Sequence, residues 1–72
     1  MESKFKERLK ELRKEEGLTQ KNLASKIGTT DDCIFYWEAG RSEPCIGDII
    51  KLAEFFQVSA DYLLGISDKY EI

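Results

Sequence analysis

Apolar residues recur along this chain at the spacing of α-helices. Near the N-terminus, Phe5, Leu9 and Leu12 follow the i, i+4, i+7 pattern of one helix face, and charged residues of both signs occupy the other. Ser3 is placed to cap this helix and Gly17 to end it. A basic amphipathic helix lying on a membrane is the alternative, but the narrow stripe and the mixed charges favour core packing.

A second helix is predicted directly after Thr19. Thr19 is a good N-cap, and Leu23, Ala24 and Ile27 then recur on one helix face. Gly28 follows at once, where the helix can stop because glycine tolerates a positive φ.

A third helix is predicted from Thr30 to Ala39. Thr30 is its N-cap candidate, and Ile34 and Trp37 continue at helical spacing until Gly40 ends the segment. Two helices of about two turns each, joined by a short turn, form a helix-turn-helix, the unit that presents one helix to a DNA groove.

A fourth helix is expected from about Ile46 to Gln57, after a loop that contains Pro44. Its wide apolar face suits a central core helix and comprises Ile49, Ile50, Leu52, Ala53 and Phe56. Cys45 is a weak N-cap, and Asp48 in the first turn compensates in part through the helix dipole.

A short fifth helix is expected over residues 60–64, capped by Ser59 and ended by Gly65. Residues 66–72 form either a frayed tail or part of a subunit interface. The second option rests on the apolar side chains Ile66, Tyr70 and Ile72.

The spacing inside the helix pair is specific. Counting Gln20 as the first position, the small Ala24 is fifth and Gly28 is ninth, while Ile34 and Trp37 are fifteenth and eighteenth. A small fifth residue allows close approach of the helices, the ninth reverses the chain, and the last two fill the wedge. This pattern resembles the Cro/repressor-type, xenobiotic-response-element-like helix-turn-helix family of phage repressors and small bacterial regulators.

The resemblance covers nearly the whole chain, from about Phe5 to Gly65. The matching residues are Leu18-Thr19-Gln20, Leu23-Ala24, Lys26-Ile27-Gly28, Ile34, Trp37-Glu38, Gly40-Arg41, Pro44 and Asp61-Tyr62-Leu63-Leu64-Gly65. It implies an all-α, compact five-helix lambda-repressor-like DNA-binding domain over residues 1–66, with the helix-turn-helix at helices 2–3, and a short C-terminal tail over 67–72. It also implies a structural salt bridge between Arg13 and Glu38.

By family position, base edges would be contacted by Asp31, Asp32 and Tyr36, with Phe35 beside them. Relatives usually place Gln, Arg, Ser or Lys at these positions. Here the two carboxylates either accept hydrogen bonds from cytosine N4 or are solvated acids that help the helix to start. The two aromatic rings either contact thymine methyl groups or form a protein-binding patch.

Phosphate contacts are expected from Gln20, Lys21, Thr30 and Arg41. Gln20 is the most specific of these, because the family's glutamine at that position bonds a phosphate at the helix start. Lys21 could equally be a solvated surface lysine.

Composition changes the interpretation in one respect. The 72 residues are 42% hydrophobic and 35% charged, which is typical of one compact domain, but the net charge is −3. Residues 1–27 carry eight basic and five acidic side chains, whereas residues 28–72 carry three basic and nine acidic ones. A DNA-binding protein usually has a basic balance, so the local field at the docking surface must decide.

Several classes of site and location are not expected. No run of about 18 apolar residues indicates a membrane span, and the basic start lacks the apolar core of a secretory signal, so a cytoplasmic location is expected. With two cysteines, Cys33 and Cys45, and no histidine, neither a metal site nor a cofactor is expected. The cysteines are interpreted as half-buried small apolar residues.

Two functions follow from the pattern. The first is a sequence-specific transcriptional regulator that binds double-stranded DNA as a homodimer, with helix 3 in the major groove. The second is a protein-interaction module derived from this fold, whose acidic and aromatic face no longer binds DNA. An enzyme with a small-molecule substrate is not expected, since no nucleophile stands beside a base.

Overall fold

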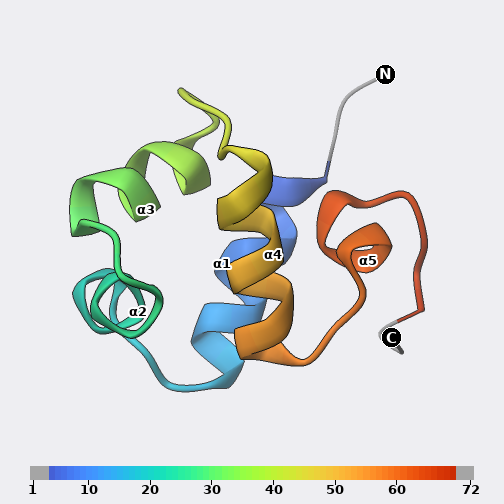
Figure 1. Ribbon diagram of the computed structural model, residues 1–72, viewed down its shortest axis with the longest axis horizontal. Coiled ribbons are helices and arrows are strands. Elements are labelled where there is room, and N and C mark those ends of the chain that lie inside the picture. The colour runs from blue at the N-terminus through green and yellow to red at the C-terminus, as the bar shows by residue number, and fades with distance from the viewer. Residues whose placement is uncertain (1–3, 70–72) are drawn as a thin grey trace.

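The structure, a computed structural model, describes residues 4–69, and these residues form five α-helices and no strand. The helices are α1 (Phe5–Glu15), α2 (Gln20–Ile27), α3 (Asp31–Ala39), α4 (Ile46–Phe56) and α5 (Ala60–Leu64). Figure 1 shows α1 and α4 in the middle of the molecule, with α2 and α3 on one side and α5 on the other. The predicted all-α architecture with five helices is confirmed for this part of the chain.

Side-chain caps start three of the helices as predicted. The hydroxyl oxygens of Thr19, Thr30 and Ser59 each accept a hydrogen bond from the backbone N–H three residues later, at 3.0, 3.3 and 3.0 Å. At α4, the Asp48 carboxylate accepts the backbone N–H of Cys45 at 3.0 Å. Each bond satisfies a donor that the first helical turn leaves without an intrahelical partner.

Two helix boundaries differ from the prediction. The N-cap residue of α1 is Lys4, which makes no side-chain cap hydrogen bond, and Ser3 lies outside the described residues. Helix α4 ends at Phe56, because Gln57 adopts the left-handed conformation with φ of 56°. That conformation costs a non-glycine residue about 1 kcal/mol, and here it turns the chain so that the next residue, Val58, is buried.

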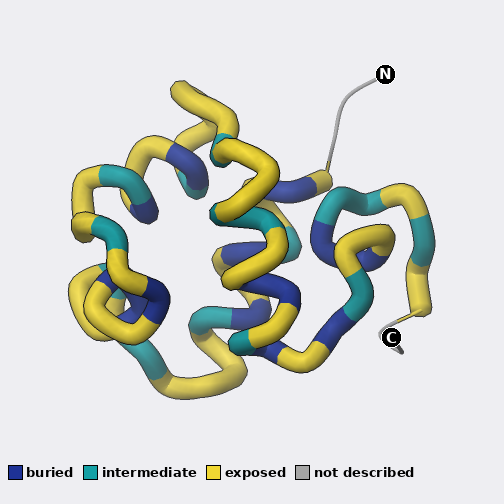
Figure 2. The backbone as a smooth tube through the Cα atoms, viewed as in Figure 1, coloured by how far each residue is buried: buried dark blue, intermediate teal, exposed yellow. Residues whose placement is uncertain are grey.

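Each helix contributes one fully buried aliphatic side chain to a single core. These side chains are Leu9, Leu23, Ile34, Leu52 and Leu63. Figure 2 shows the buried segments of all five helices in dark blue. The rings of Phe5 and Trp37 meet edge to face with centroids 6.4 Å apart, which joins α1 to α3. No helix can therefore shift without disturbing the packing of the others.

Two residues expected in or near the core are instead exposed. Ile50 is 52% exposed, because α4 packs on α2 and α5 and turns its remaining flank to solvent. Cys45 is also exposed, since it precedes the first turn of α4, whereas Cys33 is half-buried as expected. The apolar stripe of α4 is thus wider than the surface that its neighbours cover.

The segment after α5 is fastened to α1. Arg8 places its guanidinium 4.0 Å from the ring centre of Tyr62 and donates a hydrogen bond of 2.7 Å to Asp68. Gly65 lies against the start of α1, where a side-chain Cβ would stand 2.9 Å from the backbone nitrogen of Lys4. Of the apolar tail residues, Ile66 is 69% exposed, and Tyr70 and Ile72 lie outside the described residues.

Candidate nucleic-acid interface

Helices α2 and α3 pack directly on each other through the turn predicted from their sequence. Ala24 is 2% exposed, so its small side chain lets the two backbones approach closely. Gly28 has φ of 76°, a left-handed conformation that reverses the chain without a Cβ clash, and the next N–H donates to the Ala24 carbonyl at 2.9 Å. Ile34 and Trp37 fill the space behind the turn.

The outward flank of α3 carries all four residues predicted to contact bases. Asp31, Asp32, Phe35 and Tyr36 are exposed, and their i, i+1, i+4, i+5 spacing places them on one side of the helix. Phe35 and Tyr36 are 49% and 43% exposed, and their rings meet edge to face with centroids 5.6 Å apart. Helix α3 therefore presents an acidic first turn followed by a pair of aromatic rings.

Arg13 and Glu38 form a bidentate ion pair that holds α3 against α1. The guanidinium donates hydrogen bonds of 2.6 and 2.9 Å to the two carboxylate oxygens, and the side chains are 11% and 5% exposed. The hydrogen bond with Glu38 raises the pKa of Arg13 above its ordinary value, against the opposing effect of burial. Both charges are thus engaged within the fold and serve to position α3.

Sequence reasoning did not anticipate two further contacts in this network. Arg13 also donates to the backbone carbonyl of Leu18 at 2.8 Å, and the side-chain amide of Gln20 donates to Glu38 at 3.2 Å. Gln20 was predicted to contact phosphate, and the contact with Glu38 uses only one of its two amide N–H groups. A polar residue at the first position of α2 is the only sequence signal for this bond.

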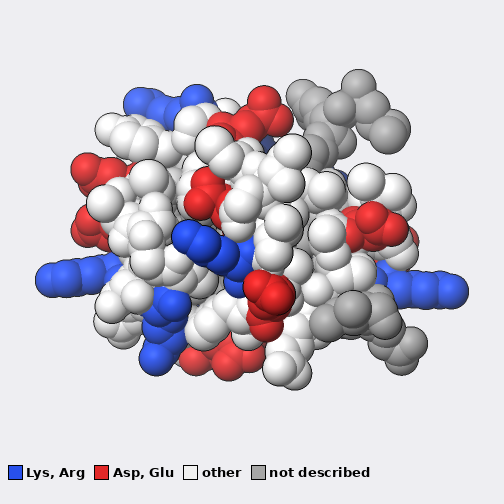
Figure 3. Space-filling view, in the orientation of Figure 1, with Lys and Arg blue, Asp and Glu red and all other residues white. Residues whose placement is uncertain are grey.

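The other predicted phosphate contacts border α3. Lys21 lies in the first turn of α2, and Thr30 precedes α3, where its hydroxyl also donates to the Cys33 sulfur at 3.2 Å. Arg41 follows the left-handed Gly40 at the end of α3. All three residues are exposed. Figure 3 shows basic groups over α2 beside acidic groups over the start of α3, so this side of the molecule carries both signs of charge.

Hydrogen bonds from the turn and cap act on the thiol of Cys33 in the first turn of α3. The hydrogen bond with Thr29 and, to a lesser extent, those with Thr30 lower the pKa of this thiol below its ordinary value. These contacts belong to the turn and cap, and they help to fix the start of the exposed flank.

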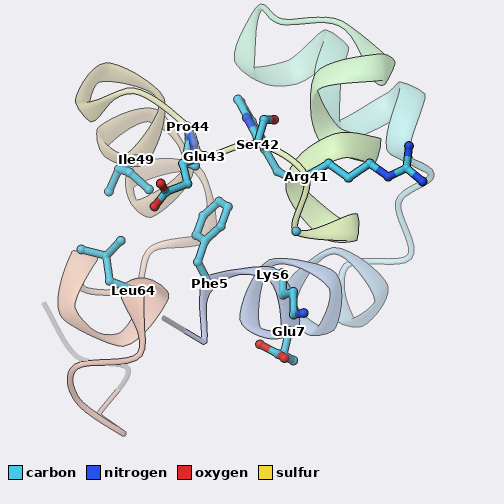
Figure 4. A pocket seen from close by; sticks show the side chains of 11 residues that line it. Phe5, Lys6, Glu7, Arg41, Ser42, Glu43, Pro44, Ile49 and Leu64 are labelled. Carbon is cyan, nitrogen blue, oxygen red and sulfur yellow. The ribbon is translucent and has the colours of Figure 1, made fainter. Parts of the chain in front are cut away.

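A shallow cleft of about 590 Å³ lies beside the interface, between the loop after α3, the start of α1 and α5. Figure 4 shows Phe5, Ile49 and Leu64 on its apolar side, while the Arg41 side chain extends away from it. Lys6 and Glu7 also line it, so its charged groups are of opposite sign. Within residues 4–69, no three His, Cys, Asp or Glu side chains come together to hold a metal ion.

No helix among the described residues is long and apolar enough to cross a membrane. The architecture defines a class of protein: a five-helix domain of the lambda-repressor type, in which a helix-turn-helix exposes one flank of its second helix.

Similarity to known proteins identifies the family of this chain. A family model described as Helix-turn-helix matches residues 9–63. An uncharacterized HTH-type transcriptional regulator of Archaeoglobus fulgidus is 31% identical over 62 residues, which cover 86% of this chain and 89% of that protein. The chain belongs to this helix-turn-helix family.

The chain is also similar to a regulator of Bacillus subtilis and to a phage repressor of known structure. The uncharacterized HTH-type transcriptional regulator YobD of Bacillus subtilis is 39% identical over 62 residues, covering 86% of this chain and 55% of YobD. The structure of the P22 c2 repressor in complex with a synthetic operator superposes with a TM-score of 0.79 at 32% identity, covering 83% of this chain and 91% of the repressor. The chain spans about half the length of the Bacillus relatives that it matches.

Proposed function

We propose that this protein is a sequence-specific DNA-binding transcriptional regulator that inserts α3 into the major groove. The observation that carries the proposal is the outward flank of α3, held in place by a buried core and by the pair of Arg13 with Glu38. The similarity to a repressor solved on an operator supports it. A helix with one flank free and the other fully packed can enter a groove without unfolding.

The phosphate contacts in this proposal come from Gln20, Lys21, Thr30 and Arg41. The N-terminus of α2 adds backbone N–H groups and the positive end of a helix dipole. Because only Lys21 and Arg41 among these contacts are cationic, the affinity will fall less steeply with salt than for a domain with many basic phosphate contacts.

Base recognition in this proposal comes from Asp31, Asp32, Phe35 and Tyr36. A homodimer would place two copies of α3 about 34 Å apart on a two-fold operator. The surface around α5, with exposed Ile66 beside it, is the proposed place for the subunit contact. A cytoplasmic location is part of the same proposal, because the target is chromosomal DNA.

Fluorescence anisotropy with labelled genomic fragments, measured across a salt series, tests the proposal. We expect one or a few fragments to bind far more tightly than random duplex, and Arg41→Ala to weaken binding to all fragments alike. Lys69→Ala is the matched control, since Lys69 is an exposed basic residue in the segment after α5, and α5 lies on the other side of α1 and α4 from α3 (Figure 1). Failure to retain any fragment near its own gene at low salt would refute the proposal.

A protein-interaction module is the second candidate, and the acidic and aromatic composition of the α3 flank favours it. If this candidate is correct, Asp31→Asn combined with Asp32→Asn leaves DNA retention unchanged, while Phe35→Ala abolishes a protein complex. The regulator proposal predicts that both changes alter DNA binding.

A further inference from the structure

The exposed flank of α3 is unusual in its hydrogen-bonding groups. The helix sequence DDCIFYWEA contains no Lys, Arg, Asn or Gln. These are the side chains that make bidentate contacts with guanine or adenine in the major groove. Base recognition by this helix therefore has to use a different chemistry.

The largest groups on the flank are the rings of Phe35 and Tyr36. Their edge-to-face contact at 5.6 Å holds each ring against the other, so the pair offers a preformed apolar surface. Each residue is about half exposed, Phe35 at 49% and Tyr36 at 43%. The thymine C5-methyl is the apolar group that unmodified bases present in the major groove.

We propose that Phe35 and Tyr36 set the base preference of this domain by packing against thymine methyl groups, so that each half-site is read through thymines. The inference rests on the proposed function and specifies which groups of the DNA the α3 flank contacts.

The acidic first turn imposes a second, different preference on the bases that it faces. Asp31 and Asp32 are exposed, and one Asp31 oxygen already accepts the backbone N–H of Asp32 at 3.1 Å. Carboxylates can accept hydrogen bonds but cannot donate them, whereas guanine offers only acceptors in the major groove. The two acids therefore disfavour guanine, and also thymine, whose O4 is an acceptor, beneath the first turn, whereas the aromatic rings favour thymine beneath the second turn.

Replacing thymine by deoxyuridine tests the inference, since this change removes only the methyl group. The probe is a fluorescein-labelled duplex recovered by the full chain from a randomised pool, with one thymine replaced at a time. We expect deoxyuridine at one or two positions of each half-site to weaken binding about fourfold, the effect of one buried methyl group.

Protein variants locate the contact. In Phe35→Ala the deoxyuridine effect at the contacted thymine disappears, while Phe35→Leu, which keeps an apolar side chain, retains part of it. The matched control Ile50→Ala removes an exposed apolar side chain from α4 and keeps the full fourfold effect. Circular dichroism of each variant verifies that the helices are intact.

Loss of the thymine contact and loss of DNA binding give different results in this experiment. A recovered duplex that tolerates deoxyuridine at every position overturns the thymine contact and leaves DNA binding established. An effect that persists unchanged in Phe35→Ala and in Tyr36→Ala assigns the methyl contact to another residue and also overturns the inference. If the chain recovers no duplex from the pool, both proposals fail.

Discussion

The inward and outward sides of α3, a helix of nine residues, differ in burial and in the contacts that their side chains make. On the inward side, Ile34 and Trp37 are buried and Glu38 is tied to Arg13. On the outward side, Phe35 and Tyr36 are about half exposed and meet edge to face, and two exposed acids occupy the first turn. The inward side is fixed by packing, and a change there alters the whole fold. The outward side is free of that constraint, so it can depart from the family's usual polar residues without loss of the domain.

The strongest test of this contrast is truncation of Ile34, which is fully buried. We expect Ile34→Ala to lower the free energy of unfolding by about 4 kcal/mol, through lost apolar burial and the cavity left behind. Urea denaturation followed by circular dichroism measures it. The neighbouring Phe35→Ala should change stability by no more than about 0.5 kcal/mol. Equal losses in the two variants would show that the outward side is also structural.

Removal of Glu38 tests the polar part of the inward side. Glu38→Ala leaves the guanidinium of Arg13 largely buried without its partner, and we expect a loss of about 3 kcal/mol in unfolding free energy. Glu38→Gln should lose less, because its amide oxygen still accepts a hydrogen bond. If Glu38→Ala melts at the same temperature as the parent protein, the ion pair does not hold α3 in place.

Thr30 stands where the two sides meet. Thr30→Ala removes the cap of α3 and should lower the unfolding free energy by about 1 kcal/mol, while Thr30→Ser retains most of it. Urea denaturation of the three proteins side by side gives the difference. If Thr30 also contacts a phosphate, DNA affinity falls further in Thr30→Ala than in Thr30→Ser. Equal affinity of the two variants would restrict Thr30 to its capping role.

The smallest stability effect is expected for the acidic turn. Asp31→Asn combined with Asp32→Asn should lower stability by about 0.5 kcal/mol, because exposed first-turn acids interact only weakly with the helix dipole. Binding to random duplex should tighten at low salt, since two charges facing the polyanion are removed, and the gain should shrink as salt rises. Anisotropy titrations at two salt concentrations measure it. A gain that does not depend on salt would contradict an electrostatic origin.

The sequence predicted which residues of α3 are exposed, but it did not predict the hydrogen bond between Gln20 and Glu38. The four residues of the α3 flank are exposed together because helical spacing alone puts them there. The bond from Gln20 to Glu38 joins residues of two helices and depends on how closely α2 approaches the end of α3. Spacing along one helix contains no information about that approach.

The sequence by itself determined the features that depend on neighbours a few positions away. Thr19, Thr30 and Ser59 cap helices because each hydroxyl needs only a backbone N–H three residues later, and Gly28 ends α2 because it lacks a Cβ. These local signals were sufficient to give the order of the five helices.

Only the tertiary structure decided which parts of the surface are covered. Ile50 belongs to the apolar stripe of α4, yet it is exposed because no other helix reaches that flank. Arg8 meets Asp68 across 60 positions of sequence, and Gln57 takes a left-handed conformation that brings Val58 into the core. Burial and ion pairing depend on which distant groups arrive at the same place, and that is fixed by the packing of all the helices together.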